Sequence, residues 1–206
     1  MSGSVWNGIL GFFAYAVLAV AAQNAVFTRA LGVSRLVRIV EDGSIELYKF
    51  GALLGAVQLI SSVLGFCFNR LLAGVALSWK GAVQPLILVL CSTVAFFVVL
   101  LTLALAGSKN TARSYLDLLP MATFNCCVLG TLLLTTTGGY TLAQTIAFSL
   151  GSSAGYVGAV VLVNEGQRRI QNRNLPASFR GLPINLIYIG VLALAVYGFT
   201  GHTLAI

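Results

Sequence analysis

The sequence predicts an all-α integral membrane protein with six transmembrane helices. Of its 206 residues, 58% are hydrophobic and only 8% are charged, whereas about a quarter of the residues are charged in a typical soluble domain. The hydrophobic residues also fall into six long runs that are separated by short polar segments. Because too few polar side chains remain to cover a water-facing surface, most of the surface must face lipid.

Each run has the length of a membrane-spanning helix, which needs about 20 mostly apolar residues. None shows the strict alternation of apolar and polar residues that is typical of an outer-membrane strand. We therefore expect a single membrane domain, residues 1–206. The predicted spans are residues 5–27, 47–68, 82–106, 118–136, 142–163 and 182–199.

The first run shares one feature with a signal peptide, the small residues Ala19-Val20-Ala21. A signal peptide carries positive charge before its apolar stretch. Here the first basic residue is Arg29, which follows the apolar stretch. We expect a retained first helix.

The basic residues are distributed unevenly between the two sides of the membrane. The breaks after the first, third and fifth spans hold ten of the 12 lysines and arginines, and the other side holds only Arg70 and Lys80. Cytoplasmic loops are rich in Lys and Arg, so we expect both termini outside, in a bacterial inner (cytoplasmic) membrane. The net charge of +7 is explained by these loops and the lipid surface, and no nucleic-acid partner is expected.

Six helices divide into two sets of three, halves of about residues 1–108 and 109–206. A duplicated unit with an odd number of spans inserts its second copy upside down, as in many transporters with broken helices. The first helix of each half carries a polar interruption, at Gln23-Asn24 and at Phe124-Asn125. An asparagine in a membrane helix can instead simply bond a neighbouring helix, and spacing alone does not choose between the two.

Adjacent cysteines, Cys126 and Cys127, follow the second interruption. Thiolates are the ligands of iron–sulfur clusters, but neighbouring residues on a helix point about 100° apart. One cysteine could bind iron while the other packs. Buried cysteines also often serve as small apolar core residues, and composition alone favours that role.

Other residues restrict the chemistry that the chain can perform alone. Asn24 and Asn125 are candidates for lining a site where the halves meet, because an unpaired amide in hydrocarbon is costly. None of the acidic residues lies clearly within a span, and Asp117 and Glu165 lie at span ends. An ion carrier usually buries a carboxylate at depth, so another subunit would have to supply one. There is a single histidine, His202, and no glycine-rich nucleotide loop.

A long polar stretch, residues 164–181, separates the last two spans and contains four arginines. It can be read as an orientation anchor that meets anionic lipid. It can also be read as a docking surface for a neighbouring subunit.

Several motifs resemble those of a known family, RnfA and NqrE, membrane subunits of the Rnf complex and of the sodium-pumping NADH:quinone oxidoreductase. Leu119-Pro120 with Asn125-Cys126-Cys127-Val128-Leu129-Gly130 is similar to the family's "LP…TNCAVLG". Residues 175–181 are similar to "VPAPFRG", residues 197–201 to "MGFSG", and residues 23–32 to "NNFVLVKFLG". The resemblance covers most of the chain, although the second and third spans add little beyond hydrophobicity.

The resemblance implies six helices in two inverted halves, and a homologous partner subunit of opposite topology, of the RnfE/NqrD type. The two subunits would share a 2Fe-2S cluster near mid-membrane, each giving one cysteine from each half. That cluster would carry electrons between the other subunits of the complex, linked to sodium or proton movement. Cys126 falls on the second-half ligand.

One position departs from the family pattern. The family's first-half cysteine lies in "LGLCPF", where this chain reads Leu31-Gly32-Val33-Ser34-Arg35, so that Ser34 occupies the expected cysteine position. Cys127 is absent from the family pattern and is an alternative ligand. We expect a subunit of an ion-translocating oxidoreductase that is inactive alone. A small-solute permease and a cluster-free structural subunit of the same complex are the alternatives.

Overall fold

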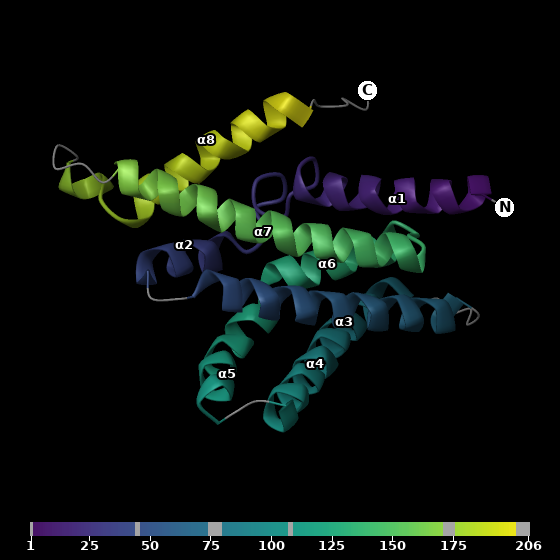
Figure 1. The fold of residues 1–206 in the computed structure, drawn as a ribbon. Coiled ribbons are helices and arrows are strands. Elements are labelled where there is room, and N and C mark those ends of the chain that lie inside the picture. Colours follow the sequence, from purple (N-terminus) through teal and green to yellow (C-terminus); the bar gives the residue numbers. More distant parts are fainter. Residues whose placement is uncertain (1, 44–45, 74–79, 107–108, 171–175, 201–206) are drawn as a thin grey trace.

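The computed structural model describes residues 2–43, 46–73, 80–106, 109–170 and 176–200. Within these residues every regular element is a helix, which confirms the all-α prediction (Figure 1). The elements are α1 (Ser2–Val20), α2 (Val33–Asp42), α3 (Leu47–Ala73), α4 (Lys80–Ala106), α5 (Lys109–Thr123), α6 (Cys126–Thr137), α7 (Leu142–Ile170), the 3-10 helix η1 (Ala177–Phe179) and α8 (Leu182–Thr200).

Helix α7 lies at the centre of the molecule and packs against α1, α2, α3, α6 and α8. In Figure 1, α1, α3 and α7 run side by side, while α8 diverges on one side and α4 with α5 on the other. The membrane-length window of α7 is 61% buried, against 11% for that of α8. Small residues such as Gly151, Ser152 and Gly155 allow this close packing of helices in a membrane.

Four helices of the described chain are long and apolar enough to cross a membrane, over Leu47–Leu71, Val83–Leu105, Leu142–Ile170 and Leu182–Thr200. A fifth crossing is formed when Ser114–Thr123 and Cys126–Thr137, which meet at an angle of 51°, are counted as one broken span. The first predicted span contains a shorter apolar helix, Gly8–Val20. Each of the six predicted runs therefore contains a helix or a broken helix pair.

The first span was predicted wrongly at its end. The prediction carried the helix to Phe27, but α1 stops at Val20 and residues 21–32 form turns. The side-chain oxygen of Asn24 accepts hydrogen bonds from the backbone N–H groups of Val26 and Phe27, at 2.9 and 3.2 Å. These bonds offer the backbone an alternative to the helical ladder.

The chain then enters α2, a helix that the sequence analysis did not predict. Gly32 has a left-handed backbone with φ of 76°, which glycine adopts at little cost, and α2 begins directly after it. Leu36, Val37, Ile39 and Val40 form the buried face of α2, and its charged residues face outward. Ten residues are too few to span a membrane, so a prediction based on span-length apolar runs did not detect α2 in the polar segment between the first two spans.

The predicted interruption in the second half is confirmed. Helix α5 ends at Thr123, Phe124 and Asn125 leave the helix, and α6 begins at Cys126. Both interruptions therefore lie where the sequence places its polar residues.

The two ends of the helix bundle differ in charge. The ends of α2 and α7 and the starts of α3 and α8 lie at one end of the molecule, and the end of α3, which carries Arg70, lies at the other (Figure 1). Arg35, Arg38, Arg168 and Arg169 belong to the first of these ends. Of the 164–181 stretch, residues 171–175 lie outside the described part of the chain, as does His202.

The crossing of α1 and α7 depends on a glycine. A Cβ atom at Gly151 would meet the backbone oxygen of Ala16 and the Cβ of Ala19. Overpacking of this kind costs about 1–3 kcal/mol, so we expect Gly151→Ala to lower the melting temperature of the detergent-purified protein. Gly158 on the same helix faces open space, and Gly158→Ala should leave the melting temperature unchanged or raise it. Equal melting temperatures for both variants would contradict this packing.

Candidate functional site

The two helix interruptions meet in the middle of the molecule. A Cβ atom at Gly32 would lie 2.5 Å from Oδ1 of Asn125 and 2.7 Å from the ring of Tyr156. The side chain of Leu31 lies against Gly130 on α6. The first interruption is therefore packed onto the start of α6 and onto α7, and only glycine fits at position 32.

Asn24 ties the first interruption to α7. Its Nδ2 donates to the backbone oxygen of Val20 at 2.8 Å and to that of Gly155 at 3.2 Å, while its Oδ1 accepts the two backbone N–H groups of residues 26 and 27. The side chain is buried, and its amide oxygen and nitrogen both have partners. Asn24 thus satisfies backbone groups that α1 leaves open at its end.

Asn125 caps the helix that follows the second interruption, and Tyr156 of α7 bonds the first interruption. Oδ1 of Asn125 accepts from the backbone N–H of Cys127 at 3.1 Å and so caps the N-terminus of α6. The hydroxyl of Tyr156 donates to the backbone oxygen of Gly32 at 2.9 Å. Nδ2 of Asn125 is buried and has no hydrogen-bond partner in the described structure. This nitrogen can still donate to a bound group.

The adjacent cysteines point in different directions, as helix geometry predicts. Cys126 is exposed and begins a face of α6 that continues through the exposed Leu133 and Thr137. Cys127 is fully buried, and its sulfur lies 3.8 Å from Oγ of Ser152. Cys126 is therefore the cysteine of this pair that can reach a group outside the chain.

Ser34 lies on a different surface. It is exposed at the start of α2 and lines an open cleft of about 550 Å³ together with Arg38, Leu182 and Leu186. Leu31 and Gly32 are the residues of its segment that reach α6. Ser34 is close to the interruption in sequence, but its surroundings are those of α2 and the start of α8.

Comparison with known proteins identifies the family. The family described as "Rnf-Nqr subunit, membrane protein" matches residues 12–203. The chain belongs to the Rnf-Nqr family of membrane subunits. It is thus a multi-pass membrane protein, and the family predicted from the motifs is confirmed.

Three relatives show the range of similarity. The chain is 39% identical over 116 residues to the A subunit of the ion-translocating oxidoreductase complex of Syntrophotalea carbinolica, covering 53% of this chain and 60% of the relative. It is 31% identical over 128 residues to the A subunit of the Na(+)-translocating ferredoxin:NAD(+) oxidoreductase complex of Acetobacterium woodii (59% and 67%). It is 29% identical over 143 residues to the E subunit of the Na(+)-translocating NADH-quinone reductase of Saccharophagus degradans (66% and 71%). The match spans about three fifths of the length of the first relative.

The four cysteines of this Rnf-Nqr protein lie apart, except for the adjacent Cys126 and Cys127. Within the described residues, no group of three or more His, Cys, Asp or Glu side chains could hold a metal ion. Cys91 is buried beside Leu88 and Leu132, and Cys67 is exposed near the end of α3. A 2Fe-2S cluster takes four ligands. Cys126, accessible on an outer face, could supply one such ligand.

A buried polar cluster was missed by the sequence analysis of this Rnf-Nqr protein. Nε2 of Gln58 on α3 donates to the hydroxyls of Thr131 on α6 and Ser152 on α7, the latter at 2.9 Å. The two hydroxyls lie 2.8 Å apart. A glutamine inside an apolar run was the available signal, because a polar side chain in a span requires partners.

The cap of α6 can be tested directly. Asn125→Ala removes the acceptor for the backbone N–H of Cys127, and loss of an N-cap costs about 0.5–2 kcal/mol. We expect a lower melting temperature for Asn125→Ala and partial recovery in Asn125→Ser, because serine also caps helices. If the melting temperature of Asn125→Ser is lowered as much as that of Asn125→Ala, the capping hydrogen bond is not the source of the stabilisation by Asn125.

Proposed function

We propose that this chain is the A/E-type subunit of an ion-translocating membrane electron-transport complex, of the Rnf type or of the sodium-pumping NADH:quinone oxidoreductase type. The names of its relatives support this, since they are complex subunits of these types. Electron donors and acceptors would be bound by other subunits. The observation that carries the proposal is an exposed cysteine at a broken membrane helix in a member of the Rnf-Nqr family.

In this proposal Cys126 is this chain's ligand to a 2Fe-2S cluster that is shared with a homologous subunit of opposite topology. When bound, such a cluster accepts and releases one electron at a time near mid-membrane. The position of Cys126 supports the role, because Cys126 is exposed where the broken span resumes as α6. Asn125 would fix the direction of α6, and Asn24 would hold the facing interruption.

Ser34 and Cys127 have secondary roles in the proposal. With serine at position 34 and Cys127 buried, this chain has one accessible thiol at the interruptions, so the other three ligands of a cluster would have to come from the rest of the complex. Ser34 lines the cleft beside α8, and Cys127 is sealed within the chain. The buried thiol of Cys127 would pack beside the site and would not bind iron.

The helix order supports an inverted repeat of α1–α4 and α5–α8. Each set begins with a helix that breaks at an asparagine and continues as a second, shorter helix. The packing is also reciprocal, since α1 packs against α7 while α5 packs against α3. Two halves that exchange their first helices in this way would bring the two interruptions together.

The charge of the two ends supports an orientation with both termini outside. Arg35, Arg38, Arg168 and Arg169 belong to the end that would face the cytoplasm under the positive-inside rule. In Figure 1, α1 begins toward one end of the molecule and α8 runs back toward that same end.

A cluster-free structural subunit of the same complex is the second candidate. The serine at the position of the expected first-half cysteine favours it. In that case Cys126 would only pack against the partner.

The two candidates are separated by replacing Cys126. We expect Cys126→Ala to assemble into the purified complex but to reduce its non-haem iron by one cluster and to abolish electron transfer through the membrane part. Cys91→Ala, at a buried apolar contact, should keep both the iron and the electron transfer. Unchanged iron and electron transfer in assembled Cys126→Ala would leave the structural subunit as the remaining candidate.

A further inference from the structure

Buried polar side chains recur along one side of each of three helices, α3, α6 and α7, which pack against one another. Its members are each at most 4% exposed and come from all three helices: Gln58, Ser61, Ser62, Thr131, Thr135, Thr145, Ser149 and Ser152. On each helix they recur three or four residues apart, which places them on one face. We call this set the polar seam.

The inner end of the polar seam lies at the helix interruptions. Gln58, Thr131 and Ser152 bond to one another there, and the sulfur of Cys127 lies 3.8 Å from the Ser152 hydroxyl. Cys127 follows directly after the proposed ligand Cys126. The inner end of the seam is thus one side chain away from the candidate site.

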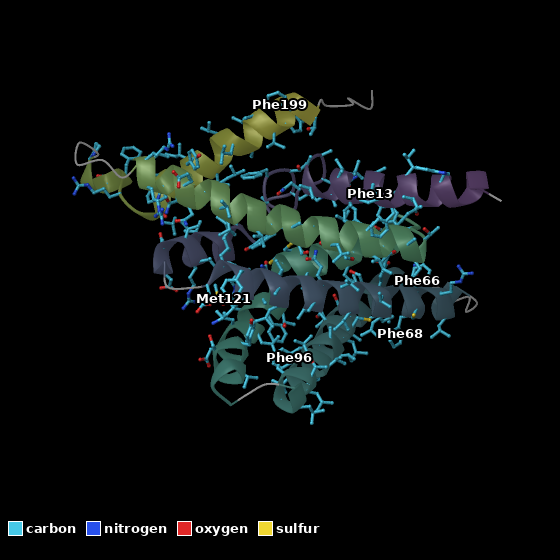
Figure 2. All side chains as sticks on the ribbon, in the orientation of Figure 1. Phe13, Phe66, Phe68, Phe96, Met121 and Phe199 are labelled. Carbon is cyan, nitrogen blue, oxygen red and sulfur yellow. The ribbon has the colours of Figure 1, made fainter. Side chains whose placement is uncertain are left out.

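The outer end of the polar seam opens at the membrane face where α3 ends. A cavity of about 190 Å³ is lined there by Asn69, Arg70, Thr135, Thr136 and Tyr140, among others, and Figure 2 labels its neighbour Phe66 at this end of α3. Nδ2 of Asn69 donates to the backbone oxygen of Thr136 at 3.1 Å. Eleven residues separate Gln58 from Asn69, or about 16 Å along a helix at 1.5 Å per residue. That is about half of the hydrocarbon thickness.

Three side-chain atoms along the polar seam lack hydrogen bonds. They are Oε1 of Gln58, Oγ of Ser62 and Oγ1 of Thr145, and all three are buried. A buried polar atom in protein normally finds a partner in protein or ordered water, and each unmet group is costly within a membrane. These three atoms come from two helices and lie at different depths along the seam. The polar seam therefore contains atoms at several depths that each need a hydrogen-bond partner.

On the other side of the interruptions, toward the end of the molecule that carries α2, the interior is mostly apolar. Between α3 and α7, most buried side chains in this region are large and apolar or aromatic, among them Phe50, Leu54, Tyr156 and Val160. The hydroxyl of Tyr156 donates to the backbone oxygen of Gly32. The hydroxyl of Ser153, which lies against Gly55, donates to the backbone oxygen of Leu150. Buried polar side chains thus extend from the interruptions toward one membrane face. Mostly apolar side chains fill the interior between the interruptions and the other face.

We propose that the polar seam is a hydrated half-channel, a file of water molecules that connects the Asn69–Tyr140 cavity with the helix interruptions. Water suits these atoms because it can donate to the amide oxygen of Gln58 and either donate to or accept from the hydroxyls of Ser62 and Thr145. The half-channel would open only at the face where α3 ends. This inference rests in part on the proposed function, under which the seam is the route by which the translocated ion reaches the interruption from that face.

The chain contains a matched pair of native probes for this water. Cys127 lies at the inner end of the seam and Cys91 lies in the apolar contact of α4 with α6, and they are 0% and 1% exposed. Hydroxyl radicals formed from bound water by an X-ray pulse oxidise thiols that lie beside that water. In the full complex in lipid nanodiscs, we expect several-fold faster oxidation of Cys127 than of Cys91, measured by peptide mass spectrometry.

Substitutions in the seam provide the control. Gln58→Leu removes the amide whose oxygen lacks a partner and should bring the oxidation rate of Cys127 down to that of Cys91. Ser62→Ala should reduce it less. Ser92→Ala changes a serine of equal burial whose hydroxyl already donates to the backbone oxygen of Val89, and it should have no effect. Equal slow oxidation of Cys127 and Cys91 in the native complex, or a Cys127 rate that is unchanged by Gln58→Leu, would overturn the half-channel.

This experiment fails or succeeds independently of the iron measurement. Fast oxidation of Cys127 in a complex whose iron does not depend on Cys126 would support the half-channel and reject the shared cluster. A cluster that depends on Cys126, beside a Cys127 as slow as Cys91, would reject the half-channel alone.

Discussion

Backbone that leaves a helix within a membrane must find hydrogen-bond partners inside the protein, and the rest of this structure depends on how that need is met. Asn24 accepts hydrogen bonds from two backbone N–H groups of its own turn and donates one to the backbone oxygen of Gly155 on α7. Asn125 caps α6, and Tyr156 of α7 bonds the backbone of Gly32. Irregular backbone at membrane depth is tolerated only where it is buried in protein in this way.

The first interruption bonds α7 at Gly155 and Tyr156, and its Gly32 lies against Asn125 of the second interruption. This arrangement turns one face of α6 outward, with Cys126 at its start, and turns the opposite face inward, where Cys127 and Thr131 meet α3 and α7. The exposed face suits a partner subunit and the inner face suits water. One structural constraint therefore gives rise to both surfaces on which the proposals depend.

The sequence predicted the helices and their interruptions because hydrophobic runs and single asparagines are local signals. It did not predict α2, since ten amphipathic residues beside a polar break resemble a loop when only span length is considered. The separation of Cys126 from Cys127 followed from helix geometry. The contact of Leu31 with Gly130 and the meeting of Gln58 with Thr131 and Ser152 did not, because they depend on how distant helices pack.

The contact of the two interruptions is tested most directly by a cross-link between them. In a chain whose native cysteines are replaced by alanine, Leu31→Cys and Gly130→Cys place two thiols at the contact of the Leu31 side chain with α6. Mild oxidation in membranes should join them in a disulfide, while Leu31→Cys with Gly8→Cys, near the far end of α1 at a position that also faces open space, should stay reduced. A correctly inserted Leu31→Cys/Gly130→Cys chain that forms no disulfide would contradict the meeting of the interruptions.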